Sequence, residues 1–191
     1  ETFNIDSRKI PSRVSEKTRA IIPVHLFGLC ADMDSIREAI PRRVKILEDA
    51  ACAAGASYKN VPAGSLGDAG VFSFHPRKSI TTGEGGMVTT NDQALAEQMV
   101  KMRNHGASIS EEQRHHGSKP YLLPDFDQLG FNYRMTDFQA ALGYSQVKNY
   151  KNNLAARHKI AKRYVKNLSK VNNIRFMPYS KDSSYFVFQI F

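Results

Sequence analysis

The segment FSFHPRKSITTGEGG, residues 72–86, places a lysine between an apolar run and a glycine-rich turn. The run DAGVFSFHP (68–76) has the length and composition of a buried strand, and so has GGMVTTN (85–91). Lys78 therefore follows a strand end, where open parallel sheets bind their ligands. A lysine amine becomes nucleophilic when it is partly desolvated or lies beside another cation, and Arg77 is adjacent. This position raises Lys78 above an ordinary surface lysine as a candidate for Schiff-base chemistry.

Strand-like and helix-like segments alternate on both sides of this stretch. The pattern predicts strands over 19–28 and 44–50, helices over 31–43, 92–106 and 136–168, a long surface loop over 107–127, and a strand in the final apolar run. Asp32 or Asp34 can cap the first helix, and the last helix is long enough to contain a bend. Strands that alternate with helices in this way predict an α/β fold with a mainly parallel sheet.

The same pattern predicts two parts of unequal size. Residues 1–150 are expected to form a large domain. Residues 151–191 are expected to form a connecting helix and the start of a small C-terminal domain, because the apolar run at the end of the chain reads as the first strand of a new unit.

Composition narrows the function classes. The chain is 41% apolar and 24% charged, and no apolar run approaches the roughly 20 residues of a membrane span. A net charge of +9 can indicate a polyanionic partner, but many basic residues are spaced as the solvated face of a helix, and nucleic-acid-binding motifs are absent. Cys30 and Cys52 have no disulfide or metal spacing and are expected to be free thiols in a reducing cytoplasm. The adjacent His115 and His116 lack completing ligands, so no metal site is predicted.

Two further strand ends carry polar residues that suit cofactor chemistry. A carboxylate at a strand end can keep a pyridinium nitrogen protonated, and the run 44–50 ends in Glu48 and Asp49, either of which could serve. Ser73 offers a hydroxyl for a phosphate oxygen, and the following glycine-rich turn offers backbone N–H groups. Each signal has an ordinary structural alternative, a cap or turn carboxylate and a strand serine, so none decides the function alone.

Taken in order, four segments resemble one family. They are VHLFGLCADMDSI (24–36), ILEDAACAAGASYKN (46–60), GSLGDAGVFSFHPRKSITTGEGGMVTTND (64–92) and LGFNYRMTDFQAALG (129–143). They resemble the DegT/DnrJ/EryC1/StrS family of pyridoxal phosphate (PLP) dependent nucleotide-sugar aminotransferases, and the resemblance runs from about Thr2 to the end. It implies the fold type I, aspartate aminotransferase-like architecture: a three-layer αβα large domain with a mostly parallel mixed sheet, followed by the start of a small domain.

The resemblance also implies roles for individual residues. Lys78 is expected to bind PLP as a Schiff base and then to carry a proton between cofactor and substrate. Asp49 is expected to pair with the pyridine nitrogen and Ser73 to bind the phosphate. Asn132, in GFNYR, is expected to reach the phosphate of the neighbouring subunit's cofactor. Cys52 stands where the family often has a glutamine that contacts the cofactor's ring hydroxyl, so that contact is expected to be absent or made differently, because a thiol is a weak donor.

The reaction implied is a two-stage transamination. L-Glutamate gives its amino group to PLP, and a nucleotide-diphosphate keto sugar then accepts it and becomes an amino sugar for lipopolysaccharide, capsule, glycan or antibiotic synthesis. Active sites shared across a homodimer in a bacterial cytoplasm are implied, without nucleic acid or membrane. The loop 107–127 looks longer than in many relatives and is expected to help shape the sugar pocket.

Three alternatives stay open at this point. A PLP- or pyridoxamine phosphate-dependent sugar dehydratase would carry a histidine in place of Lys78. Family members are roughly twice this length, so the chain is expected to be truncated at both ends, and a non-catalytic fragment or a regulatory protein of the same fold would explain that. A nucleic-acid-binding protein rests only on charge and would need steeply salt-dependent binding.

Overall fold

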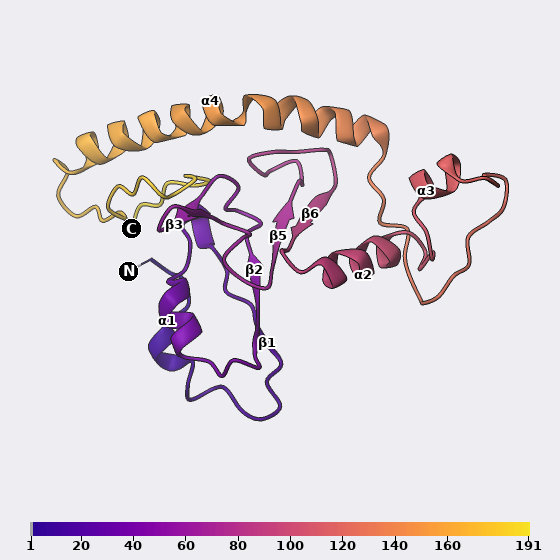
Figure 1. Ribbon diagram of the computed structural model, residues 1–191. Helices are drawn as coiled ribbons and strands as arrows, with labels where there is room; N and C mark the ends of the chain where they lie inside the picture. Colours follow the sequence, from indigo (N-terminus) through magenta and orange to yellow (C-terminus); the bar gives the residue numbers. More distant parts are fainter. Residues whose placement is uncertain (1) are drawn as a thin grey trace.

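The computed structural model describes residues 2–191, so residue 1 of the domain expected over 1–150 lies outside the described residues (Figure 1). The main sheet contains β1 (Ala20–Ile21), β2 (Lys45–Asp49), β5 (Ala69–Ser73) and β6 (Gly86–Thr89), in the order β1-β2-β5-β6. The first three strands are parallel, and β6 pairs antiparallel with β5. The expected α/β fold with a mostly parallel mixed sheet is therefore confirmed.

The strand expected over 19–28 was wrong in its length. Only Ala20 and Ile21 form β1. Pro23 has no N–H to give to a sheet ladder, although its carbonyl still accepts the N–H of Asp49 at 2.9 Å. Phe27 and Gly28 then take positive φ values of 60° and 94° inside the short 3-10 helix Leu26–Gly28, which turns the chain out of the sheet.

Local caps set the helices close to their expected positions. Asp32, one of the two candidate caps, accepts the Ser35 N–H and begins α1 (Met33–Glu38). Asp92 caps α2 (Gln93–Arg103), and Thr136 and Gln139 form a reciprocal capping box at the start of α4 (Asp137–Leu168). α4 is one helix of 32 residues. The proposed domain boundary at residue 150 therefore falls inside this helix, and the division stays a prediction.

Four local features depart from the expected pattern. A hairpin of β3 (Ser57–Tyr58) and β4 (Val61–Pro62) turns at Lys59 and Asn60, both at positive φ. The expected loop 107–127 contains α3 (Glu111–His116), which begins at a capping box of Ser110 and Gln113 and includes His115 and His116. The expected C-terminal strand was wrong: in the described chain, residues 176–190 contribute a single bridge, between Phe176 and Ile190. A further 3-10 turn spans Ser7–Lys9.

Two apolar clusters support the sheet. The first packs α1 against β2 and is made of Ile10, Ala31, Met33, Ile36 and Ile46. The second lies under the turn after β2 and consists of small side chains: Cys30, Ala50, Ala53, Ala56 and Ala63. Small side chains let backbone segments approach closely, so the turn after β2 sits tightly against its neighbours. Figure 1 shows α4 running along the top of the molecule, above the strands, with α1 at the lower left beside β1 and β2. In the part of the chain that the structure describes, no helix is both long and apolar enough to cross a bilayer.

Candidate active site

The Lys78 amine lies where three chain segments meet. Lys78 itself follows β5, in a turn closed by its N–H donating to the His75 carbonyl at 2.9 Å. Its Nζ donates to Cys52 Sγ, in the turn after β2, at 3.2 Å. The same Nζ lies 5.2 Å from the centre of the Phe186 ring, in the C-terminal segment. Lys78 is half-buried among a thiol and an aromatic ring, so its amine is partly desolvated, as a nucleophilic lysine requires.

Asp49 and Ser73 lie on the same face of the sheet as one another. β2 and β5 are parallel, and Asp49 stands opposite Val71 in their register. Ser73 is two residues beyond Val71, and side chains two apart on a strand point to the same face. Asp49 Oδ1 accepts the Ala51 N–H at 3.1 Å, and Ser73 Oγ accepts the His75 N–H at 3.3 Å. A carboxylate and a hydroxyl are thus fixed at adjacent strand ends, beside the turn that carries Lys78.

Glu48, the other candidate carboxylate, is fully buried and already engaged by the protein. Its Oε1 accepts the N–H groups of Leu66 and Gly67 at 2.6 and 2.7 Å. Its Oε2 accepts the Gly64 N–H at 2.7 Å and a hydrogen bond from His25 Nε2 at 2.9 Å. Burial raises the pKa of Glu48, but these hydrogen bonds outweigh it and hold the pKa below its usual value. Glu48 therefore clamps the 63–67 turn, which leaves Asp49 as the strand-end carboxylate that can meet a ligand.

His25 completes this buried pair in a defined tautomer. Its Nδ1 accepts the Ala31 N–H at 3.2 Å, so the ring proton sits on Nε2 and is donated to Glu48. Its backbone N–H donates to the Asp49 carbonyl at 3.0 Å. The imidazole and backbone of His25 therefore hold two consecutive residues of β2, Glu48 and Asp49.

Asn132 lies apart from these residues. It bridges Asn104 at the end of α2, and the flanking Phe131 and Tyr133 donate their N–H groups to Met102 and Arg103. Figure 1 places the segment between α3 and α4 beyond α2, at the opposite end of the molecule from the C-terminal segment that carries Phe186. We call residues 104–136 the arm. Large apolar side chains on and next to the arm are more than 70% exposed: Tyr121, Leu123, Leu129, Tyr133 and Phe138.

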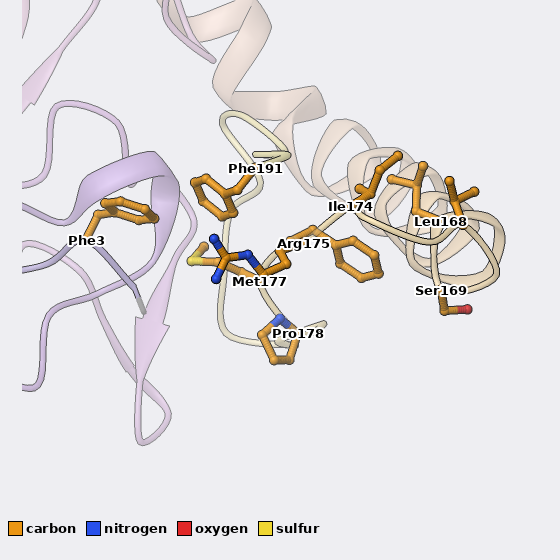
Figure 2. A pocket seen from close by; sticks show the side chains of 10 residues that line it. Phe3, Leu168, Ser169, Ile174, Arg175, Met177, Pro178 and Phe191 are labelled. Atoms are coloured by element: carbon orange, nitrogen blue, oxygen red, sulfur yellow. The ribbon is translucent and has the colours of Figure 1, made fainter.

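Two cavities lie away from Lys78. One of about 560 Å³ is shown in Figure 2 and is lined by Phe3, Leu168, Ser169, Val171, Ile174, Arg175, Phe176, Met177, Pro178 and Phe191. Its apolar lining includes the stacked rings of Phe3 and Phe191, with centres 4.8 Å apart. The other, about 220 Å³, lies in the arm beside Arg114 and Arg134. Among residues 2–191 no three His, Cys, Asp or Glu side chains gather in a way that could hold a metal.

The structure thus brings together Asp49, Cys52, Ser73 and Lys78 and separates Asn132 from them. Sequence reasoning missed Phe186, whose contact with Lys78 spans most of the chain and has no local signal. It also missed the pair of His25 and Glu48, although each of these polar residues interrupts an apolar run, a pattern that could have suggested a buried pair.

Known proteins give an independent view of this arrangement. The chain is 43% identical over 173 residues to a protein of Caulobacter vibrioides named GDP-perosamine synthase. The aligned region covers 90% of this chain and 44% of that protein. Its fold matches that of Helicobacter pylori PseC, an aminotransferase involved in the biosynthesis of pseudoaminic acid, with a TM-score of 0.88 and 30% identity over 98% of this chain and 49% of that one. It also matches an E. coli GDP-4-keto-6-deoxy-D-mannose-3-dehydratase with bound hydrated PLP, with a TM-score of 0.84 and 26% identity over 99% of this chain and 50% of that one.

These matches cover almost all of this chain, which spans about half the length of each of those relatives. The likeness extends from the sheet to the arm and α4, because the matched structures cover 98–99% of the described fold. Residues 1–191 match the DegT/DnrJ/EryC1/StrS aminotransferase family throughout, and the chain belongs to that family.

Proposed function

We propose that the protein is a PLP-dependent aminotransferase that moves an amino group from L-glutamate to a nucleotide-diphosphate keto sugar. The observation that carries the proposal is the partly desolvated Lys78 amine beside Asp49 and Ser73 at adjacent strand ends. Family membership and the similarity to a GDP-perosamine synthase support the sugar-nucleotide substrate class. The product is an amino sugar, for lipopolysaccharide or a related glycan.

The residues present fit PLP in kind and in placement. The cofactor needs an amine for its aldehyde, an anion for its pyridinium nitrogen and donors for its phosphate. Lys78 supplies the amine, Asp49 the anion and the Ser73 hydroxyl one donor, and all three lie at the carboxyl ends of β2 and β5. When bound, PLP supplies the electron sink that stabilises negative charge at the substrate carbon.

Each side chain then has a distinct task. Lys78 Nζ would hold the cofactor and would carry a proton to and from the substrate carbon. Asp49 would favour the protonated pyridine nitrogen, because a carboxylate beside that nitrogen stabilises its charged form. Cys52 Sγ accepts a hydrogen bond from Lys78 Nζ at 3.2 Å, so the thiol contacts the amine, and the ring-hydroxyl contact expected of a glutamine at this position would be absent or made differently.

A homodimer with shared sites accounts for the arm. Asn132 pairs with Asn104 at the end of α2 in its own chain, while the arm presents exposed apolar side chains of the kind that interfaces bury. We infer that the arm of one protomer reaches the Lys78 site of the other and that Asn132 contacts the cofactor phosphate there. The free thiols of Cys30 and Cys52 suit the cytoplasm, where L-glutamate and nucleotide sugars are available.

The test is the visible absorption spectrum of the protein with PLP, before and after L-glutamate. Lys78→Ala is compared with Lys151→Ala, which removes an exposed lysine of α4 and controls for adventitious reaction of surface amines. We expect a band that needs Lys78, is kept in Lys151→Ala and is lost with glutamate, and borohydride reduction should place the cofactor mass on Lys78. An unchanged band in Lys78→Ala would refute the proposal.

The second candidate function is the dehydratase reaction, which the fold match to a PLP-containing dehydratase favours. Lys78 opposes it, since the resemblance gives dehydratases a histidine at this position. Incubation with a GDP-linked 4-keto sugar and L-glutamate distinguishes the two. Incorporation of nitrogen from ¹⁵N-glutamate into the sugar identifies the aminotransferase, and loss of a sugar hydroxyl without nitrogen uptake identifies the dehydratase.

A further inference from the structure

Three polar side chains of α4 reach across to the backbones of three separate loops. Gln146 makes two hydrogen bonds with Thr81: its Nε2 donates to the Thr81 carbonyl at 2.5 Å, and its Oε1 accepts the Thr81 N–H at 3.1 Å. The Tyr150 hydroxyl donates to the Ala54 carbonyl at 2.6 Å. Arg157 Nη1 donates to the carbonyls of Tyr185 and Phe186 at 2.9 and 3.3 Å.

The three side chains form one row along the helix. At about 100° per residue, Tyr150 lies about 40° and Arg157 about 20° around the axis from Gln146. All three are half-buried, on the side of α4 that faces the sheet. We call Gln146, Tyr150 and Arg157 the α4 row. Side chains in a row with this spacing can hold three loops in fixed positions relative to one helix.

The loops that the α4 row holds are the same three that meet at the Lys78 amine. Thr81 is three residues after Lys78, and Ala54 is two residues after Cys52. The Phe186 carbonyl accepts from Arg157 while the Phe186 ring lies beside Lys78 Nζ. Phe186 is therefore bonded to α4 through its own backbone, and the loops that carry Lys78 and Cys52 are each bonded to one side chain of α4 through a residue two or three positions further along.

We propose that Gln146, Tyr150 and Arg157 are positioning residues that set the placement of Lys78, Cys52 and Phe186 relative to one another. They act only through the loop backbones. The inference rests on the proposed function of Lys78 for its role in catalysis, but the positioning itself is a property of the chain without cofactor.

Tyr150 is the sharpest point at which to test it. Burial raises the pKa of Tyr150, against a smaller lowering by Ser79 and Arg157, so the hydroxyl stays a donor at neutral pH. Tyr150→Phe keeps the ring, which lies close to Gly55, and removes the hydroxyl together with its hydrogen bond to Ala54. Losing one such bond to a backbone carbonyl favours local opening of the loop by about 5- to 10-fold.

The two cysteines report this opening directly. Cys52 lies in the loop that Tyr150 holds, whereas Cys30 is buried in the core and burial raises the pKa of its thiol to about 12. Iodoacetamide is added to the protein without PLP, and the alkylation of each cysteine is followed by peptide mass. Tyr144→Phe, which removes the same hydroxyl from a residue 71% exposed on α4, is the matched control.

The proposal expects Cys52 to react about 5- to 10-fold faster in Tyr150→Phe, with a smaller change at Cys30, which packs against the same turn, and with Tyr144→Phe equal to the wild type. An unchanged Cys52 rate overturns it, and so does an equal rise at both cysteines, because that pattern reports global destabilisation. Arg157→Ala should weaken the affinity for PLP, and Arg157→Lys should restore part of that affinity. If the wild type takes up no PLP, the proposed function fails while the cysteine rates still decide the positioning.

Discussion

Replacing Glu48 by Gln should destabilise the fold by several kcal/mol, although the two side chains have the same size. The Glu48 carboxylate accepts four hydrogen bonds, two at each oxygen. A carboxamide has one oxygen, so its NH₂ group must face two of the four donors. His25 cannot relieve the conflict by changing tautomer, because its Nδ1 accepts the Ala31 N–H. Each buried donor left without an acceptor costs about 1–3 kcal/mol, which gives about 2–6 kcal/mol for the pair.

The assay is urea unfolding followed by far-UV circular dichroism, since the chain has no tryptophan to report by fluorescence. A loss of about 2–6 kcal/mol is a large part of the roughly 5–15 kcal/mol that stabilises a typical domain, so the midpoint should fall clearly. Glu16→Gln is the control: Glu16 is 97% exposed and pairs with Arg43 at 3.5 Å, so its loss should change the free energy of unfolding by less than about 0.5 kcal/mol. A change below about 1 kcal/mol for Glu48→Gln would refute the four-bond clamp.

The pH dependence of this effect has a definite sign. The folded-state pKa of Glu48 lies below its unfolded value of 4.5, so the carboxylate contributes stability that is complete above that value and is lost as pH falls through the folded pKa. The difference in unfolding free energy between wild type and Glu48→Gln should therefore be largest near neutral pH and shrink below about pH 4.5. Unfolding curves at pH 7 and pH 4 measure both values.

Two further changes test other parts of the structure. Gly28→Ala should destabilise the protein by about 1–3 kcal/mol and speed alkylation of Cys52, because φ at Gly28 is 94° and the added methyl group meets Ser184 and the Cys52 carbonyl. Thermal unfolding and the cysteine assay measure the two effects. A melting temperature equal to that of the wild type would contradict the packing of Ser184 against the turn. Asp92→Ala should lower the free energy of unfolding by about 1 kcal/mol by removing the cap of α2, whereas Asp92→Asn should keep most of the stability. Equal urea midpoints for the two variants would show that the Asp92 side chain does not stabilise the helix as a cap.

Local chemistry made part of the fold predictable. The Asp92 and Thr136 caps are sequence-local signals, and the helices that they begin lie where the pattern placed them. β2 and β5 end at Asp49 and Ser73, so the polar residues that followed apolar runs marked the strand ends correctly. The capping box that starts α3 was equally local, but the segment around it has no hydrophobic period, and the helix was missed.

Long-range contacts set the limits of the prediction. The apolar run at 19–28 was read as a strand by composition, yet Pro23 and the positive φ of Phe27 end the regular pairing. The C-terminal run was read as a strand because it is apolar, but its carbonyls at Tyr185 and Phe186 accept hydrogen bonds from Arg157 instead of from a neighbouring strand. The contact between Lys78 and Phe186 could not be read from the sequence, because the two residues are close only in the folded chain.

The hydrogen bond between Ser184 and Cys52 joins residues that are 132 positions apart in the sequence, and the one between Tyr150 and Ala54 joins residues that are 96 positions apart. Closing such long loops costs entropy before any contact repays it, so contacts of this kind form late in folding. The sheet and α1 rest on contacts that are closer in the chain and can form earlier. The Lys78 amine is therefore expected to remain open to solvent through most of folding, and to acquire its chemical surroundings only when the C-terminal segment docks on α4. The reactivity of the Lys78 amine during refolding would therefore change when the C-terminal segment docks. In a chain that has folded its sheet but has not docked this segment, Lys78 would react like a surface lysine.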